Sequence, residues 1–140
     1  MDNISIEKIW QDDSLFELRI KASNDFVSVT QECYIQYIDL RTICLNALEA
    51  VSGEKSEQFY AEFGSKSGNY TPAFSITVIQ EDKLGHVLIE MDMEIADNTS
   101  RAHRCSFYLR SDLGSIEKFF KNLEAIADNS IDNTAIQLHN

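Results

Sequence analysis

The stretch from Ala73 to Arg110 constrains the fold more than any other part of the chain, because apolar and polar residues alternate along it in three consecutive segments. The central segment, His86 to Ala96, reads HVLIEMDMEIA. Its two faces are Val87, Ile89, Met91, Met93 and Ile95 on one side, and Leu88, Glu90, Asp92 and Glu94 on the other. A period of two is typical of a strand that buries one face. A slip of one residue would expose the whole apolar face, so the register is strongly specified.

The segments on both sides of this strand continue the alternation. Residues 74–78 precede it across a turn that ends at Gly85, where glycine supplies a positive φ without steric cost. The third segment follows a second turn, and its two simplest registers place Arg104 opposite Glu94 or Asp92. The stretch therefore predicts three consecutive antiparallel strands.

Similar patterns predict the elements outside this stretch. Strands are expected over residues 5–10, 15–22, 26–35 and 58–64, the first of them a short edge strand. Apolar residues recur at the spacing of one helical face over residues 38–51 and 113–127, which predicts two helices. Ser111 or Asp112 is the expected N-terminal cap of the second helix.

Two segments leave alternatives open. The strand over residues 26–35 has apolar residues on both faces, with Val27, Val29 and Cys33 on one side and Phe26 and Tyr34 on the other. The pattern alone does not decide which of these faces is buried. Residues 128–140 are mostly polar, which predicts a loose tail, with a short edge strand over residues 135–138 as the alternative.

The order of these elements predicts the fold class. Adjacent strands imply antiparallel pairing, and the two helices then cover the sheet. We expect an α+β fold of the order ββ(β)–α–ββββ–α, with a mainly antiparallel sheet of about six to seven strands that is either one curved sheet or two sheets meeting at a corner. Residues 1–127 are expected to form a single domain, because 140 residues suffice for one core.

The net charge of −11 bears most directly on the kind of partner. Nucleic acid and anionic membranes repel an acidic surface, so neither is an expected partner. The natural partner is a basic protein, although acidic charge can also serve only to keep a protein soluble. The N-terminus lacks the features of a secretory signal, no apolar run could span a membrane, and the three cysteines have no C-x-x-C pair. We therefore expect a cytoplasmic protein with reduced thiols.

No residue pattern indicates catalysis or metal binding. The three histidines, His86, His103 and His139, lack the spaced partners that a zinc site or a catalytic dyad needs, and phosphate-loop and serine-nucleophile motifs are absent from the sequence. We therefore expect a non-enzymatic protein without a cofactor or a metal. Glu90, Asp92 and Glu94 lie about 7 Å apart along one strand face, an arrangement that suits solvation or a cationic partner better than acid–base chemistry.

Several segments together resemble a group of small bacterial proteins. These segments, which span residues 6–127, read IWQDDSLFELRI, YIDLRTICLNAL, FYAEFG, EDKLGHVLIEMDMEI and FYLRSDLGSIEKFFKNLEAI. They resemble immunity proteins of polymorphic toxin and contact-dependent growth inhibition systems. The resemblance implies a protein without catalytic residues that binds a basic toxin domain, often a nuclease, and occludes its active site.

The charge pattern suggests which residues would contact such a partner. We predict Glu90, Asp92 and Glu94 as the binding surface, with Asp12 and Asp13 as the alternates. Acidic residues steer the encounter with a basic partner, and buried anchors set the dissociation rate. The competing hypothesis is a module that binds a small ligand on the concave face of a sheet, or a structural interaction module.

Overall fold

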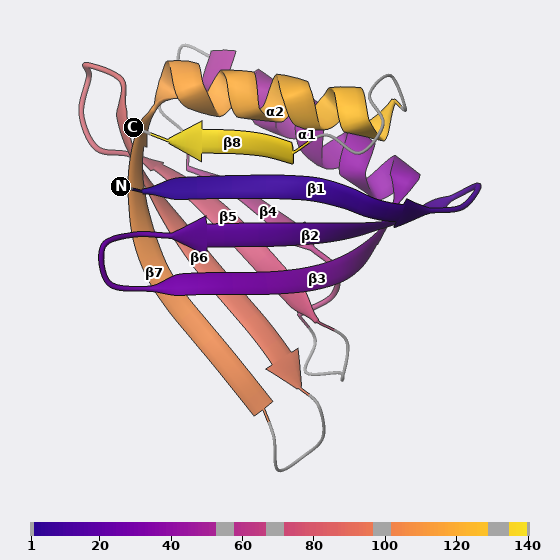
Figure 1. The fold of residues 1–140 in the computed structure, drawn as a ribbon. Coiled ribbons are helices and arrows are strands. Elements are labelled where there is room, and N and C mark those ends of the chain that lie inside the picture. The colour runs from indigo at the N-terminus through magenta and orange to yellow at the C-terminus, as the bar shows by residue number, and fades with distance from the viewer. Residues whose placement is uncertain (1, 53–57, 67–71, 97–101, 129–134, 140) are drawn as a thin grey trace.

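The computed structural model describes residues 2–52, 58–66, 72–96, 102–128 and 135–139. Within these residues it contains eight strands and two helices (Figure 1). Their bounds are β1 Asn3–Gln11, β2 Leu15–Ser23, β3 Ser28–Gln36, α1 Tyr37–Ser52, β4 Phe59–Phe63, β5 Ala73–Gln80, β6 His86–Ala96, β7 Ala102–Asp112, α2 Leu113–Ala127 and β8 Ala135–His139. The predicted α+β class is confirmed.

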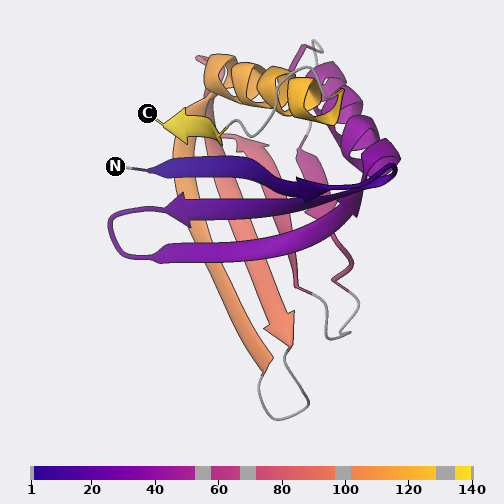
Figure 2. The same ribbon diagram turned by 45° about the vertical axis from the view of Figure 1, so that its right-hand side comes forward.

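The strands form two antiparallel sheets, which is the second of the two arrangements expected. The strand order is β3-β2-β1-β8 in the first sheet and β4-β5-β6-β7 in the second. The strands of the two sheets cross in Figure 1, and both helices lie above the sheets in Figures 1 and 2. The helices pack against each other, and one core cluster contains residues from both sheets and both helices.

The core follows the alternation of the strands and the apolar stripe of α2. In β6, Val87, Ile89, Met91 and Met93 are buried and Ile95 is half-buried, as the pattern predicts. The α2 stripe is also fully buried: it comprises Ile116, Phe119, Phe120, Leu123 and Ile126. Burial of a large apolar side chain is worth about 1.5–3 kcal/mol, so these two elements supply a large part of the driving force for folding.

The ambiguous face of β3 is decided by its pairing with β2. Cys33 lies opposite Leu18 and Ile35 lies opposite Phe16, and all four side chains are buried. The face that carries Tyr34 therefore points outward, and the Tyr34 side chain is 47% exposed.

The C-terminal strand corrects two expectations about the first sheet. Residues 135–139 form the strand β8. For this part of the segment 128–140, the short edge strand is therefore right and the loose tail is wrong. β8 pairs with β1 from Asn3↔His139 to Glu7↔Ala135, which places β1 between β2 and β8. The expectation that β1 forms a sheet edge is therefore wrong, because a strand more than a hundred residues later covers it.

Turns and caps fix the ends of the elements near the candidate surfaces. Gly85 has φ +92°, as the turn before β6 requires. Asp112 caps α2, since its Oδ1 accepts a hydrogen bond from the Ser115 amide at 2.8 Å. α1 begins directly after β3, and the Tyr37 amide donates to the Ser14 carbonyl at 2.8 Å. This bond holds the β1–β2 turn against the start of α1.

Candidate functional site

The outward-facing carboxylates of β6, namely Glu90, Asp92 and Glu94, are called the β6 strip below. The Cα partner of Arg104 is Glu94, but its guanidinium donates to Asp92, with Nε–Oδ1 at 3.2 Å and Nη2–Oδ2 at 2.8 Å. Lys66 Nζ lies 2.7 Å from Asp92 Oδ2 and 2.9 Å from Ser75 Oγ. Asp92 is therefore held between two cations on the sheet surface.

Burial and charge show that Asp92 belongs to an internal ion-pair network. The side chains of Asp92 and Lys66 are only 12% and 11% exposed. Hydrogen bonds from Arg104, and next the Lys66 ammonium, lower the pKa of Asp92 despite the opposing effect of burial. A carboxylate that already has two cationic partners contributes little free negative charge to a docking surface.

The other two members of the β6 strip are half-buried. Tyr108 donates its hydroxyl to Glu90 Oε2 at 3.3 Å. The charge of Glu94 adds to the larger effect of Asp92 in raising the pKa of Arg104. In the β6 strip, therefore, Asp92 is paired with two cations, Glu94 lies near one of them, and the hydrogen-bond partner of Glu90 is a neutral hydroxyl.

The alternates Asp12 and Asp13 lie in the β1–β2 turn. Asp12 Oδ1 accepts hydrogen bonds from the amides of Ser14 at 3.0 Å and Leu15 at 2.8 Å, and these bonds lower the pKa of Asp12. Both aspartates are exposed. The turn lies far from β6 in Figure 1, so the structure does not bring the five predicted carboxylates together.

A groove that the sequence did not reveal lies beside this turn. It has a volume of about 490 Å³ and is bounded by β3, the first turns of α1 and the end of β4. Apolar lining comes from Leu15, Ile35 and Ile43, and carboxylates come from Asp39 and Glu62. We call it the β3–α1–β4 groove. Its lining residues come from β2, β3, α1 and β4, so no local motif could have indicated it.

Exposed apolar side chains flank the groove on its β3 side. Tyr34 lines the groove and contacts Trp10 edge to face, with the ring centroids 6.3 Å apart. Each of these two side chains is 47% exposed, and Ile38, next to Asp39 on α1, is 64% exposed. Partly exposed Trp and Tyr side chains are the residue types that most often anchor protein interfaces.

Five carboxylates surround the groove or lie next to its lining residues. None of them forms an ion pair with a lysine, arginine or histidine in the described part of the chain; they are Asp12, Asp13, Glu17, Asp39 and Glu62. We call them the groove carboxylates. The charge of Glu17, and its hydrogen bond with the Tyr34 hydroxyl, raise the pKa of Tyr34. This side of the molecule therefore presents unneutralised negative charge beside exposed aromatic rings.

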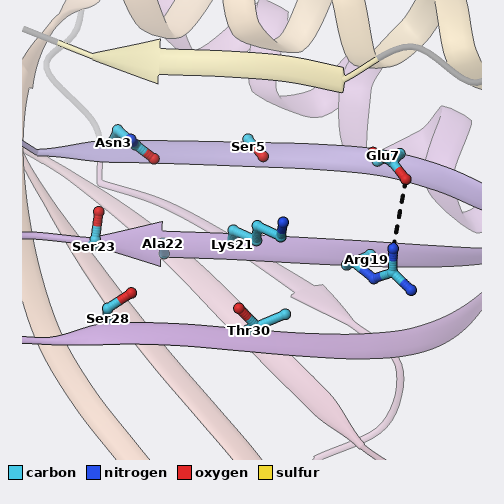
Figure 3. Close-up of a pocket in the computed structure, with 9 residues that line it drawn as sticks. All are labelled: Asn3, Ser5, Glu7, Arg19, Lys21, Ala22, Ser23, Ser28 and Thr30. Atoms are coloured by element: carbon cyan, nitrogen blue, oxygen red, sulfur yellow. Dashed lines mark ion pairs between the residues drawn. The ribbon is translucent and has the colours of Figure 1, made fainter.

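The outer face of the first sheet contains a second depression (Figure 3). It has a volume of about 390 Å³, and Lys21 lies at its centre between Ser5 and Thr30 on the adjacent strands. At one end, Arg19 pairs with Glu7 at 3.7 Å and, beyond the depression, with Glu32 at 3.0 Å. This polar depression is lined by hydroxyl groups around one ammonium group.

The remaining titratable groups have structural surroundings. His86 Nδ1 lies 2.6 Å from Asp82 Oδ2 in the β5–β6 turn, and this contact raises the pKa of His86. Burial raises the pKa of Cys33 and Cys44 to about 12, which leaves both thiols protonated and unreactive at neutral pH. Among the described residues, no group of three or more His, Cys, Asp or Glu side chains could hold a metal ion.

Comparisons with known proteins add no relative: no protein family, curated protein or solved structure matches this chain. In the described residues, neither helix has the length and apolar character needed to cross a membrane.

Proposed function

We propose that this protein binds a basic protein partner and neutralises it, in the manner of an immunity protein that occludes a toxin domain. The observation that carries the proposal is the set of groove carboxylates, which form no ion pair with a cation among the described residues. By contrast, Lys66 and Arg104 are already paired with Asp92 of the β6 strip. Unpaired like charges repel one another and reduce stability. A positively charged partner would convert this repulsion into attraction.

Two features of the groove side suit such an interaction. Its carboxylates would raise the rate of encounter with a basic surface, because opposite potentials steer diffusing proteins together. Trp10, Tyr34 and Ile38 would then supply apolar contact area, and burial of such anchors slows dissociation. Binding by this surface requires no catalytic group on the protein.

The experiment that tests the proposal is a titration against the protein encoded immediately upstream of this gene, at several salt concentrations. We expect tight binding that weakens as salt rises and that abolishes the toxicity or enzymatic activity of the partner. Absence of binding to that protein, together with growth that remains sensitive when both are expressed, would contradict the proposed function.

The polar depression of Figure 3 supports a second candidate function. Lys21 has no ionic partner among the described residues, and hydroxyl groups of Ser5, Ser23 and Thr30 line the same depression. One ammonium group with surrounding hydroxyls can bind a small anion such as a carboxylate or phosphate. Saturable binding of citrate or phosphate that is lost in Lys21→Met, while the upstream protein does not bind, would favour this candidate.

A further inference from the structure

We infer that the β3–α1–β4 groove receives an extended basic segment of the partner, which adds to the open edge of β3 and places cationic side chains against Asp39 and Glu62. This inference rests on the proposed function and specifies where and how the partner binds. Both carboxylates line the groove, from α1 and from β4.

Two of the edge strands, β7 and β3, differ in whether side chains from elsewhere in the chain cover their backbone. At the edge of β7, the carboxylate of Asp2 accepts a hydrogen bond from the Arg110 amide at 2.9 Å, and the Asn24 side chain donates to the Tyr108 carbonyl at 2.9 Å. These side chains occupy backbone groups that could otherwise pair with another strand.

The edge of β3 has no such cover in the part of the chain that the structure describes. β3 is the outermost strand of its sheet, and it pairs along its whole length with β2 only. No described side chain outside the strand is hydrogen bonded to its backbone. An extended peptide can add to such an edge, with main-chain hydrogen bonds giving affinity and alternate side chains giving specificity.

The surroundings of this edge select the chemistry of the added segment. Side chains of an added strand alternate between the Tyr34 face and the groove. On one face they would meet the exposed Tyr34 ring, which packs against Trp10 on the side away from the open edge, and on the other they would meet Asp39 and Glu62. A segment in which apolar and basic residues alternate matches both faces.

A second copy of this chain is a poor occupant of the groove. The chain has a net charge of −11, so a second copy would bring the same excess of negative charge to the acidic side of the groove. Like charges across a strand pair are destabilising, and two molecules of this charge repel at long range. Charge complementarity therefore favours a basic partner.

The probe for this inference is a capped octapeptide of alternating lysine and valine, with the matching glutamate–valine peptide as the control. The backbone amide signals of the whole protein are followed by nuclear magnetic resonance during titration. We expect saturable shifts concentrated on β3, the first turn of α1 and β4, with the lysine peptide only. The double variant Asp39→Asn/Glu62→Gln should bind about tenfold more weakly, because it loses two charge contacts of moderate strength.

The matched control variant is Glu90→Gln/Glu94→Gln, which removes the same two charges from the β6 strip and should retain the affinity for the peptide. Shifts that map elsewhere, equal weakening by both variants, or no binding of the peptide would each overturn the groove assignment. Shifts in the groove that depend on protein concentration without peptide would assign it to a second copy and also overturn the inference. The proposed function is judged separately by the titration with the upstream protein, so the two can fail independently.

Discussion

The β6 strip and the β3–α1–β4 groove both carry several carboxylates, yet their charges are arranged in opposite ways. In the β6 strip, Asp92 lies between Lys66 and Arg104, with distances of 2.7 and 2.8 Å to its Oδ2. In the groove, Asp39 and Glu62 have no ion-pair partner among the described residues. Glu62 accepts hydrogen bonds from the Tyr60 hydroxyl at 2.7 Å and from the Lys66 amide at 3.3 Å, but neither of these neutral groups compensates its charge. The same residue types are therefore neutralised by cations in one region and keep their negative charge in the other.

The difference teaches that a row of acidic residues in a sequence does not identify a docking surface. Asp92 was a predicted contact residue, but its negative charge is compensated within the fold and its side chain is mostly buried. The groove carboxylates come from the β1–β2 turn, β2, the start of α1 and the edge strand β4, and they form no ion pair with a described cation. Compensation by neighbouring cations is the property that separates the two regions.

The largest expected effect concerns Asp92. We predict that Asp92→Asn lowers the free energy of unfolding by about 2 kcal/mol, because it leaves the mostly buried Lys66 ammonium without its carboxylate. Arg104 contributes less to this loss, since its side chain is 66% exposed and solvated. Urea denaturation measures the effect.

The control is Glu62→Gln, the same type of change in the groove. Its free energy of unfolding should stay within about 0.5 kcal/mol of that of the unmodified protein. Equal losses of stability in Asp92→Asn and Glu62→Gln would contradict the difference between the β6 strip and the groove.

The next effect concerns the covered edge of β7. Asn24 Oδ1 accepts hydrogen bonds from the amides of Phe26 and Val27, both at 2.8 Å, while its side-chain amide bonds the Tyr108 carbonyl. We predict that Asn24→Ala costs about 1–2 kcal/mol, because it removes these bonds at once. Thr30→Ala, on the open edge of β3, should change the free energy of unfolding by less than about 0.5 kcal/mol. A larger effect at Thr30 would show that the β3 edge is also held by interactions within the fold.

The sequence predicted the elements whose patterns are local and long. The alternation of β6 and the stripe of α2 are strong because many successive residues agree, and both elements form where expected. The prediction that Arg104 lies opposite Glu94 or Asp92 is confirmed, and Arg104 interacts with both positions in different ways. The backbone register selects Glu94, and the long guanidinium side chain reaches diagonally to Asp92.

The features that escaped prediction depend on contacts between distant residues. β8 is short, and its place in the sheet comes from pairing with β1 at the other end of the chain. Lys66 lies in a polar segment shortly after β4, so its pairing with Asp92 follows only from the fold. The groove combines Tyr34, Asp39 and Glu62 from three elements. The outward parity of Tyr34 was the one available signal, and apolar residues on both faces of the strand obscured it.

Acidification should affect the two regions differently. The pKa of Asp92 is lower in the folded protein than in the unfolded chain, because Arg104 and Lys66 favour its charged form. Its contribution to stability is therefore complete above the unfolded pKa of about 3.9 and is lost as pH falls through the folded pKa. We predict that the stability difference between the unmodified protein and Asp92→Asn is largest near neutral pH and shrinks below about pH 4. Urea denaturation at a series of pH values checks this, and a difference that is constant with pH would contradict the ion-pair assignment.

The smallest expected effect concerns repulsion within the groove. Salt screens exposed charges, so raising the NaCl concentration from about 0.02 to about 0.2 M should stabilise the protein by a few tenths of a kcal/mol. This gain should be smaller in Asp39→Asn/Glu62→Gln and unchanged in Glu94→Gln, because Glu94 lies opposite the Arg104 guanidinium, whereas Asp39 and Glu62 form no ion pair with a described cation. Thermal unfolding at matched protein concentration measures the difference. If salt acted equally on all three proteins, the groove carboxylates would not be a source of strain, and their lack of partners would no longer point to a cationic partner that relieves it.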